Sequence, residues 1–117
     1  MARFTVTTRI SGTVEHERFD SLDSALTALE RRGHVLQGEA DAEVVGGSLM
    51  RRYEPEDQVT ARLELGGPRG LRVGVDVRGD GSAVPFTGRW IRRPVERTDG
   101  ESAYDAIRRI TVTSLGS

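Results

Sequence analysis

One stretch of this sequence, residues 59–90, alternates apolar and polar residues so regularly that it constrains the fold more than any other feature. Its apolar positions recur at every second residue in two runs: Val59, Ala61, Leu63 and Leu65, then Leu71, Val73, Val75 and Val77. A period of two places each run on one face of a β-strand. The stretch therefore predicts two antiparallel strands with one buried face, joined by the glycine-rich loop 66–70.

Two turns set the strand pairing that we expect in this stretch. The five-residue loop 66–70 and a two-residue turn at Asp80-Gly81, where glycine accepts a positive φ, each define a register. The expected pairs are Leu65–Leu71, Leu63–Val73, Glu64–Arg72 and Val59–Val77 from the first turn, and Val77–Val84, Val75–Phe86, Val73–Gly88 and Leu71–Trp90 from the second. Both registers gather apolar residues on one face, and Pro85 falls opposite Asp76, as a sheet edge or bulge allows.

Residues before this meander predict a hairpin followed by a helix. The segment 3–18 alternates like a pair of strands that turn at Ser11-Gly12. Apolar residues at helical spacing then predict a helix at about 20–32, with Asp20 as its N-cap and Gly33 as its stop signal.

The rest of the chain gives weaker signals. A second helix is expected at about 99–110, after the sequence T-D-G-E that fits a capping box at 98–101. Short strand pieces are expected at 35–36, 44–45 and 49–53, and the tail 111–115 could add an edge strand.

Together these elements predict one α+β domain over residues 1–117. Its core would be an antiparallel sheet of four to six strands, with the meander 59–91 at its centre and both helices packed on one face. With 117 residues and no cysteine, the chain is long enough for a modest core without metal or disulfide cross-links.

Composition excludes several classes of protein. The 17 basic and 18 acidic residues give a formal charge of −1, so no global charge attracts the chain to nucleic acid or membrane. No apolar run suits a signal peptide or a membrane span, and we therefore expect a cytoplasmic protein. All basic residues are arginine, and lysine and asparagine are absent. Two alternative explanations fit this bias: a GC-rich genome that disfavours the codons of both absent residues, or a role of arginine in the bidentate recognition of anions or carboxylates.

The sequence nominates no catalytic residue, metal ligand or cofactor. His16 and His34 are the two histidines, and the flanking Glu15 and Glu17 would point to the strand face opposite His16, so they do not converge with it on a metal. No phosphate-binding loop or nucleophile elbow occurs. An enzyme is therefore the less favoured class.

Three classes of function remain. The first is a non-catalytic binding or assembly module that recognises a protein partner, or its own copy as a homodimer, through a sheet edge. The second is the binding of an anion or nucleic acid through arginines on the outer sheet face, for which the expected residues are Arg62, Arg72, Arg89 and Arg93. The expected register places Arg72 directly opposite Arg89, with a shallow depression at Gly74 beside both. The third is a small-ligand pocket between sheet and helix.

Overall fold

A computed structural model describes residues 3–45, 59–88 and 91–116 of the protein. Within these residues the strands are β1 Phe4–Ile10, β2 Thr13–Phe19, β3 Val59–Gly66, β4 Arg72–Arg78, β5 Ala83–Thr87 and β6 Arg93–Pro94. The helices are α1 Leu22–Val45, α2 Ala103–Gly116 and a short 3-10 helix at Pro68–Gly70.

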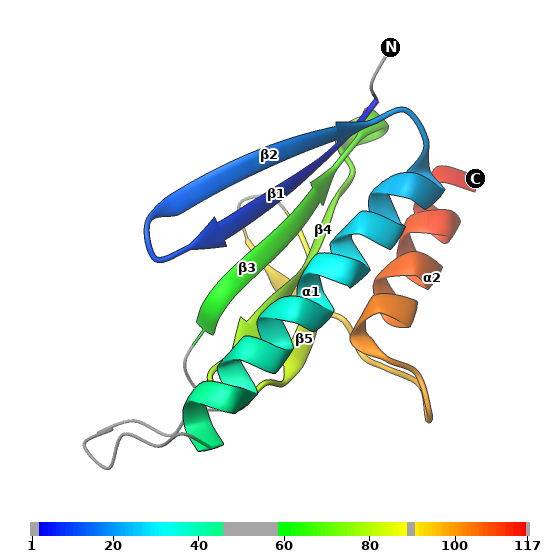
Figure 1. Cartoon of the computed structure of the whole chain (residues 1–117). Helices are drawn as coiled ribbons and strands as arrows, with labels where there is room; N and C mark the ends of the chain where they lie inside the picture. The colour runs from blue at the N-terminus through cyan, green and yellow to red at the C-terminus, as the bar shows by residue number, and fades with distance from the viewer. Residues whose placement is uncertain (1–2, 46–58, 89–90, 117) are drawn as a thin grey trace.

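The described strands form one antiparallel sheet of six strands in the order β2-β1-β3-β4-β5-β6. Both long helices lie on the same side of this sheet, with α1 over β3 and β1 and with α2 beside it towards β5 (Figure 1). The protein is therefore an α+β fold, as the sequence predicts. The expected N-terminal hairpin is also confirmed, since β1 and β2 pair along their whole length around the turn Ser11-Gly12.

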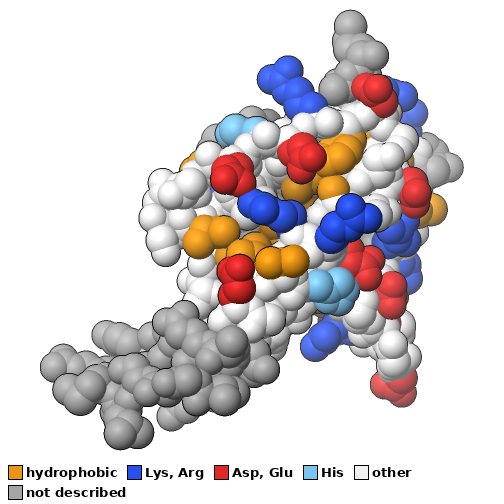
Figure 2. Space-filling model, in the orientation of Figure 1, with side chains coloured by type: hydrophobic (Ala, Val, Ile, Leu, Met, Phe, Trp, Pro, Cys, Tyr) orange, Lys and Arg blue, Asp and Glu red, His pale blue; other side chains and the backbone are white. Residues whose placement is uncertain are grey.

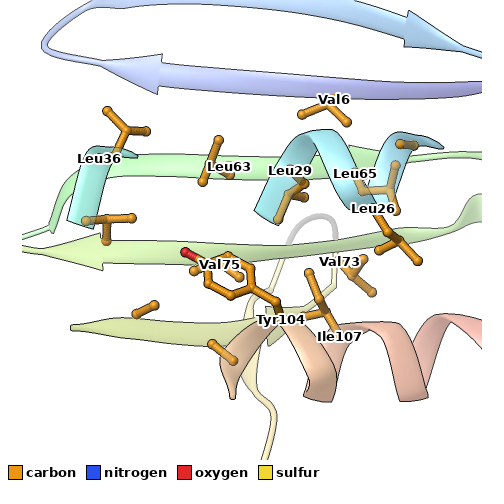
Figure 3. Packing of buried hydrophobic residues seen from close by; sticks show 14 of the residues in the cluster. Val6, Leu26, Leu29, Leu36, Leu63, Leu65, Val73, Val75, Tyr104 and Ile107 are labelled. Carbon is orange, nitrogen blue, oxygen red and sulfur yellow. The ribbon is translucent and has the colours of Figure 1, made fainter. Parts of the chain in front are cut away.

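The core lies between the sheet and the two helices. Its members come from alternate positions of β1, β3 and β4 and from the facing sides of α1 and α2 (Figure 3). The fully buried large side chains include Leu29, Leu63, Leu65, Val73, Val75, Val77 and Ile107. The period-two pattern of β3 and β4 thus identified the buried face correctly.

The predicted register between β3 and β4 is wrong by two residues. Leu63 lies opposite Val75, not Val73, and Gly66 lies opposite Arg72. The turn is displaced by one residue along the chain, because Gly66 still pairs within the sheet and the bond from Gly67 N–H to the carbonyl of Leu71 (3.2 Å) closes the turn around the 3-10 helix. Moving the centre of a hairpin by one residue shifts its register by two. An even shift preserves the faces of both strands, so their core residues remain as predicted, with one exception. Val59 lies beyond an irregularity in the register, pairs with Arg78 instead of Val77, and is exposed.

The predicted register between β4 and β5 is wrong by one residue. The turn has three residues, 79–81, because the amide of Arg78 donates to the carbonyl of Ser82 (2.9 Å) and Gly81 adopts a φ of 85°. A three-residue loop with glycine in the left-handed region is a common hairpin connection. The odd shift turns β5 over, so Pro85 faces the helices opposite Val75 and Phe86 lies on the outer face. The expected partner of Leu71, Trp90, lies outside the described residues.

Helix α1 is longer than predicted. It begins after Ser21, whose hydroxyl accepts the amide of Ser24 (3.1 Å), and it continues through Gly33 to Val45. The strand pieces expected at 35–36 and 44–45 are therefore helical, and the piece expected at 49–53 lies outside the described residues.

Helix α2 begins later and ends later than predicted. The amide of Thr98 does bond to the carboxylate of Glu101 (3.0 Å), but this pair closes a turn before the helix. A second capping box, in which Ser102 and Asp105 bond reciprocally, starts α2. The tail 111–115, expected as an edge strand, continues the helix. In the part of the chain that the structure describes, neither helix has the length and apolar character that crossing a bilayer requires.

Candidate functional site

The outer face of the sheet carries the polar residues that alternate with the core. Because both helices pack on the other side, this face is not covered by helix (Figure 1). Strand register places residues from the first five strands on it, namely Thr5, Thr7, Arg9, Val14, His16, Arg18, Arg62, Glu64, Arg72, Gly74, Asp76, Val84 and Phe86. Among these, Phe86, Thr7 and Glu64 are buried, with 3%, 5% and 8% of their surface exposed.

Arg62 is held by an acid of its own sheet. It lies opposite Asp76 and donates to both carboxylate oxygens, from Nε at 2.6 Å and from Nη2 at 3.3 Å. This bond raises the pKa of the Arg62 guanidinium. A bidentate pair of this kind uses the donors that an external anion would need.

Glu64 lies between two arginines. Its Oε1 accepts a hydrogen bond from Arg9 Nε (2.7 Å), and its Oε2 lies 3.9 Å from Arg72 Nη1. The contact joins β1 to β3, since Arg9 and Glu64 are 55 residues apart in sequence. Glu64 is therefore neutralised mainly by Arg9, and Arg72 contributes a longer electrostatic contact.

Phe86 fills the space that Gly74 leaves on this face. A Cβ at Gly74 would lie 2.5 Å from the Phe86 ring and 2.2 Å from the carbonyl oxygen of Leu63. The guanidinium carbons of Arg62 and Arg92 each lie 5.8 Å from the centre of the ring, within cation–π range. The depression expected beside Gly74 is thus occupied by an aromatic ring, which is a correction that follows from the shifted register of β5.

The four arginines expected to bind an anion do not all meet. Arg62 and Arg72 share the outer face, on β3 and β4. Arg93 pairs with Thr87 at the β6 edge, where strand alternation assigns it to the opposite face. Arg89, expected directly opposite Arg72, lies outside the described residues. Two of the four are therefore brought to one face, and one of those two is already paired.

A hollow of about 440 Å³ opens beside Arg72, at the end of β1 nearest the N-terminus. Its wall consists of two arginines, a histidine, two threonines and the glycines of the β3–β4 connection: Arg3, Thr5, Thr7, His16, Gly66, Gly67, Gly70, Leu71 and Arg72. Reasoning from the sequence missed Arg3 and His16 here, because the pairing of β1 with β3 that brings them to Arg72 carries no local sequence signal.

The edge strand β2 is the second exposed feature. It has seven residues, of which all except the half-buried Phe19 are exposed, and β1 is its only neighbour in the described sheet. Glu15 on this strand forms an ion pair with Arg32 of α1 (2.6 Å), which ties β2 to the helix layer. On the helix-bearing side, acidic and basic side chains are interspersed (Figure 2).

Comparisons with protein-family models, with curated proteins and with solved structures find no match to this chain. In the described residues, no cluster of three or more histidine or acidic side chains could hold a metal ion. Within the described residues, the outer face, the hollow and the edge of β2 are the features on which a function is proposed below.

Proposed function

We propose that this protein is a non-catalytic binding module that recognises an extended segment of another protein by strand addition to β2. The observation that carries the proposal is that β2, a regular seven-residue strand with six exposed residues, pairs on one side only within the described sheet. The free edge of such a strand presents backbone donors and acceptors that an added strand satisfies.

The two edges of the described sheet differ as docking sites. At the other edge, β6 has two residues, Arg93 and Pro94, and proline offers no N–H. A peptide could form few main-chain bonds with β6. Strand β2 contains no proline and is the better edge for a partner.

The charges of β2 favour a different chain over a second copy. A two-fold antiparallel pairing centred on His16 would place Glu15 opposite Glu17, and a pairing centred on Glu15, Glu17 or Arg18 would place that residue opposite itself. Like charges directly opposite each other destabilise a strand pair. A partner with basic residues at the two positions facing Glu15 and Glu17 would instead gain attraction on both.

The test uses a peptide designed from this register. In an antiparallel pairing, the sequence Val-Glu-Arg-Thr-Arg-Val-Thr places Val opposite Phe19, Glu opposite Arg18 and Arg opposite both Glu17 and Glu15. A control peptide exchanges its Glu and Arg positions. Fluorescence anisotropy of the labelled peptides should show tighter binding of the matched one, and amide exchange should slow in β2.

A charge-reversing variant and its matched control complete the test. Glu17→Lys should lower the affinity for the matched peptide by about fivefold or more. A favourable cross-strand pair is worth roughly 0.2–1 kcal/mol, and in this variant a repulsive pair replaces it. Glu96→Lys makes the same change at an exposed position outside β2 and should leave the affinity unchanged. Equal affinity for the two peptides, or no binding of the matched peptide at millimolar concentration, would contradict the proposal.

A further inference from the structure

We propose that the hollow beside Arg3 and Arg72 binds a small molecule through an oxyanion group, either a phosphate or a carboxylate. This site is distinct from the β2 edge and does not depend on strand addition. Its arginines come from the N-terminal segment and from β4, and the hollow lies on the sheet face that no helix covers.

Strand register assembles one row of the site across four strands. Arg18 lies beside Thr5, Thr5 beside Gly66, and Gly66 beside Arg72. The absent side chain at Gly66 leaves space for Arg72, whose guanidinium atoms lie 3.4–3.8 Å from the position that a Cβ would occupy. Arg72 therefore leans across β3 towards β1, into the hollow.

Arg72 retains donors for a ligand. Its nearest acid in the described part of the chain, Glu64, is 3.9 Å away, which is too long for a hydrogen bond. The other oxygen of Glu64 is bonded to Arg9 at 2.7 Å. Arg62 shows the contrast, because its guanidinium is engaged by Asp76 on two atoms. Among the outward arginines of β3 and β4, Arg72 is the better anion ligand.

The side chains around Arg72 suit an anion. Within the described residues the ion pairs do not include Arg3, which lines the same hollow. Arg18 adds a third guanidinium on the same face, and Glu64, the acid that faces Arg72, is offset by Arg9. No acidic residue is among the described residues that line the hollow. The hollow is thus electropositive although the chain as a whole carries a formal charge of −1.

Neutral groups complete the wall of the hollow. The Oγ1 of Thr7 lies 3.0 Å from Nδ1 of His16, which fixes the imidazole against the sheet. The Thr5 hydroxyl offers another hydrogen-bonding group. A volume of about 440 Å³ is in the range of small-molecule sites. Because one guanidinium can donate two parallel bonds to a phosphate or a carboxylate, both groups fit this chemistry.

Isothermal titration at low ionic strength with pyrophosphate and, separately, with citrate tests the site. We expect one of the two to bind at a single site with submillimolar affinity, and the tighter one identifies the oxyanion. Arg72→Gln and Arg3→Gln should each weaken that binding by tenfold or more. Arg31→Gln removes the same charge from an exposed position on α1 and should weaken it by less than twofold.

Two further readings make the test decisive. Circular dichroism of each variant checks that the fold is retained. Because there are two independent arginine variants, the site can still be tested if one of them does not fold. A chemical-shift map with the tighter anion should perturb the amides of Thr5, Gly66 and Gly67. The proposal is overturned if neither anion binds at 10 mM, or if Arg31→Gln weakens binding as much as Arg72→Gln does.

Discussion

Gly33 is expected from the sequence to end a helix, but in the structure it lies inside α1. In sequence it follows two arginines and is typical of a helix end. In the structure α1 continues through it, and the Tyr104 ring of α2 occupies the place of its missing side chain. A Cβ at Gly33 would lie 2.1 Å from the Tyr104 hydroxyl oxygen. Glycine here permits two helices to approach closely.

The same helix contains a matched control for this interpretation. Gly38 also lies inside α1, and a Cβ there would meet no atom within 4 Å. We expect Gly38→Ala to stabilise the protein by up to about 1 kcal/mol, the ordinary gain in a helix interior. Gly33→Ala should destabilise it by about 1–3 kcal/mol, because the methyl group overpacks against Tyr104. Urea denaturation measures both, and a stabilising Gly33→Ala would contradict the packing described here.

Tyr104 also fixes the two helices through its hydroxyl. The hydroxyl donates to Gln37 Oε1 (2.5 Å), and Gln37 Nε2 donates to the carbonyl of Gly81 (2.9 Å). Burial raises the pKa of Tyr104, so the phenol stays protonated and remains a donor. The side chain of Gln37 therefore connects α1 both to α2, through Tyr104, and to the β4–β5 turn.

At the scale of elements, the sequence predicted faces better than it predicted registers. Alternation alone identified the buried sides of β3 and β4, because a strand with one buried face has apolar residues at a period of two. Turn length is set by a few backbone angles, so the three-residue turn at 79–81 was mistaken for a two-residue one. That single residue moved Phe86 from the predicted core to the outer face and filled the depression expected at Gly74.

The arrangement of the candidate site was not predicted, because it also depends on strand registers. Pairing of Arg62 with Asp76 follows from the β3–β4 register, which local pattern fixed only to within two residues. The hollow at Arg3 requires the pairing of β1 with β3, and no turn connects those strands. Side chains that meet through long-range pairing were therefore beyond a reading of local sequence.

The observed register of β5 can be tested with two identical substitutions. Val75 is fully buried against the helices, whereas Val84 is half-buried on the outer face beside Asp76. Val75→Thr should cost about 1–3 kcal/mol, since it buries a hydroxyl among apolar groups. Val84→Thr should cost less than about 1 kcal/mol. Equal losses in thermal or urea unfolding would instead support the two-residue turn and its buried Val84.

The start of α2 gives the protein a pH-dependent contact. Two hydrogen bonds from Arg109, at 2.9 and 3.0 Å, together with the amide of Thr98, lower the pKa of Glu101 from 4.5 to about 2. Because the folded state lowers the pKa of this carboxyl, its ionised form stabilises the fold at pH values above the unfolded-state pKa. This contribution is lost as the pH falls from about 4.5 to about 2.

Glu101→Gln isolates this contribution. The variant should have a lower melting temperature than the wild type at pH 6, and the difference should shrink as the pH approaches 2. Asp99→Asn neutralises an exposed neighbouring acid and should leave the pH dependence unchanged. A difference between wild type and Glu101→Gln that stays constant from pH 6 to pH 2 would show that protonation of Glu101 does not contribute.

At the scale of the whole molecule, the two sides of the sheet are unequal. One side is covered by α1 and α2 (Figure 1). The other side carries paired charges and, at one end, the hollow beside Arg3 and Arg72. The sheet also has one long edge, β2, and one edge of only two residues, β6. Both proposed binding sites, the edge of β2 and the hollow at Arg3 and Arg72, therefore lie away from the helix layer.

An exposed edge strand such as β2 can pair with a second copy of the chain, but the charges of β2 oppose this pairing. Two-fold pairings of β2 centred on Glu15, His16, Glu17 or Arg18 each place like charges opposite one another, so we expect the wild type to sediment as a monomer at micromolar concentration. Glu15→Thr with Glu17→Thr removes this repulsion and adds residues that favour strands. The loss of the exposed pair with Arg32 should cost little.

We therefore expect the double variant to dimerise more strongly than the wild type in sedimentation equilibrium. Slower amide exchange in β2 of the dimer would locate the contact. Glu96→Thr with Asp99→Thr removes two acids from exposed positions outside β2 and should remain monomeric, which separates a specific edge effect from a change in net charge. A wild-type dimer with protected β2 amides would show that the acidic residues do not prevent self-pairing, and a second copy of this chain would then replace a different protein as the partner of β2.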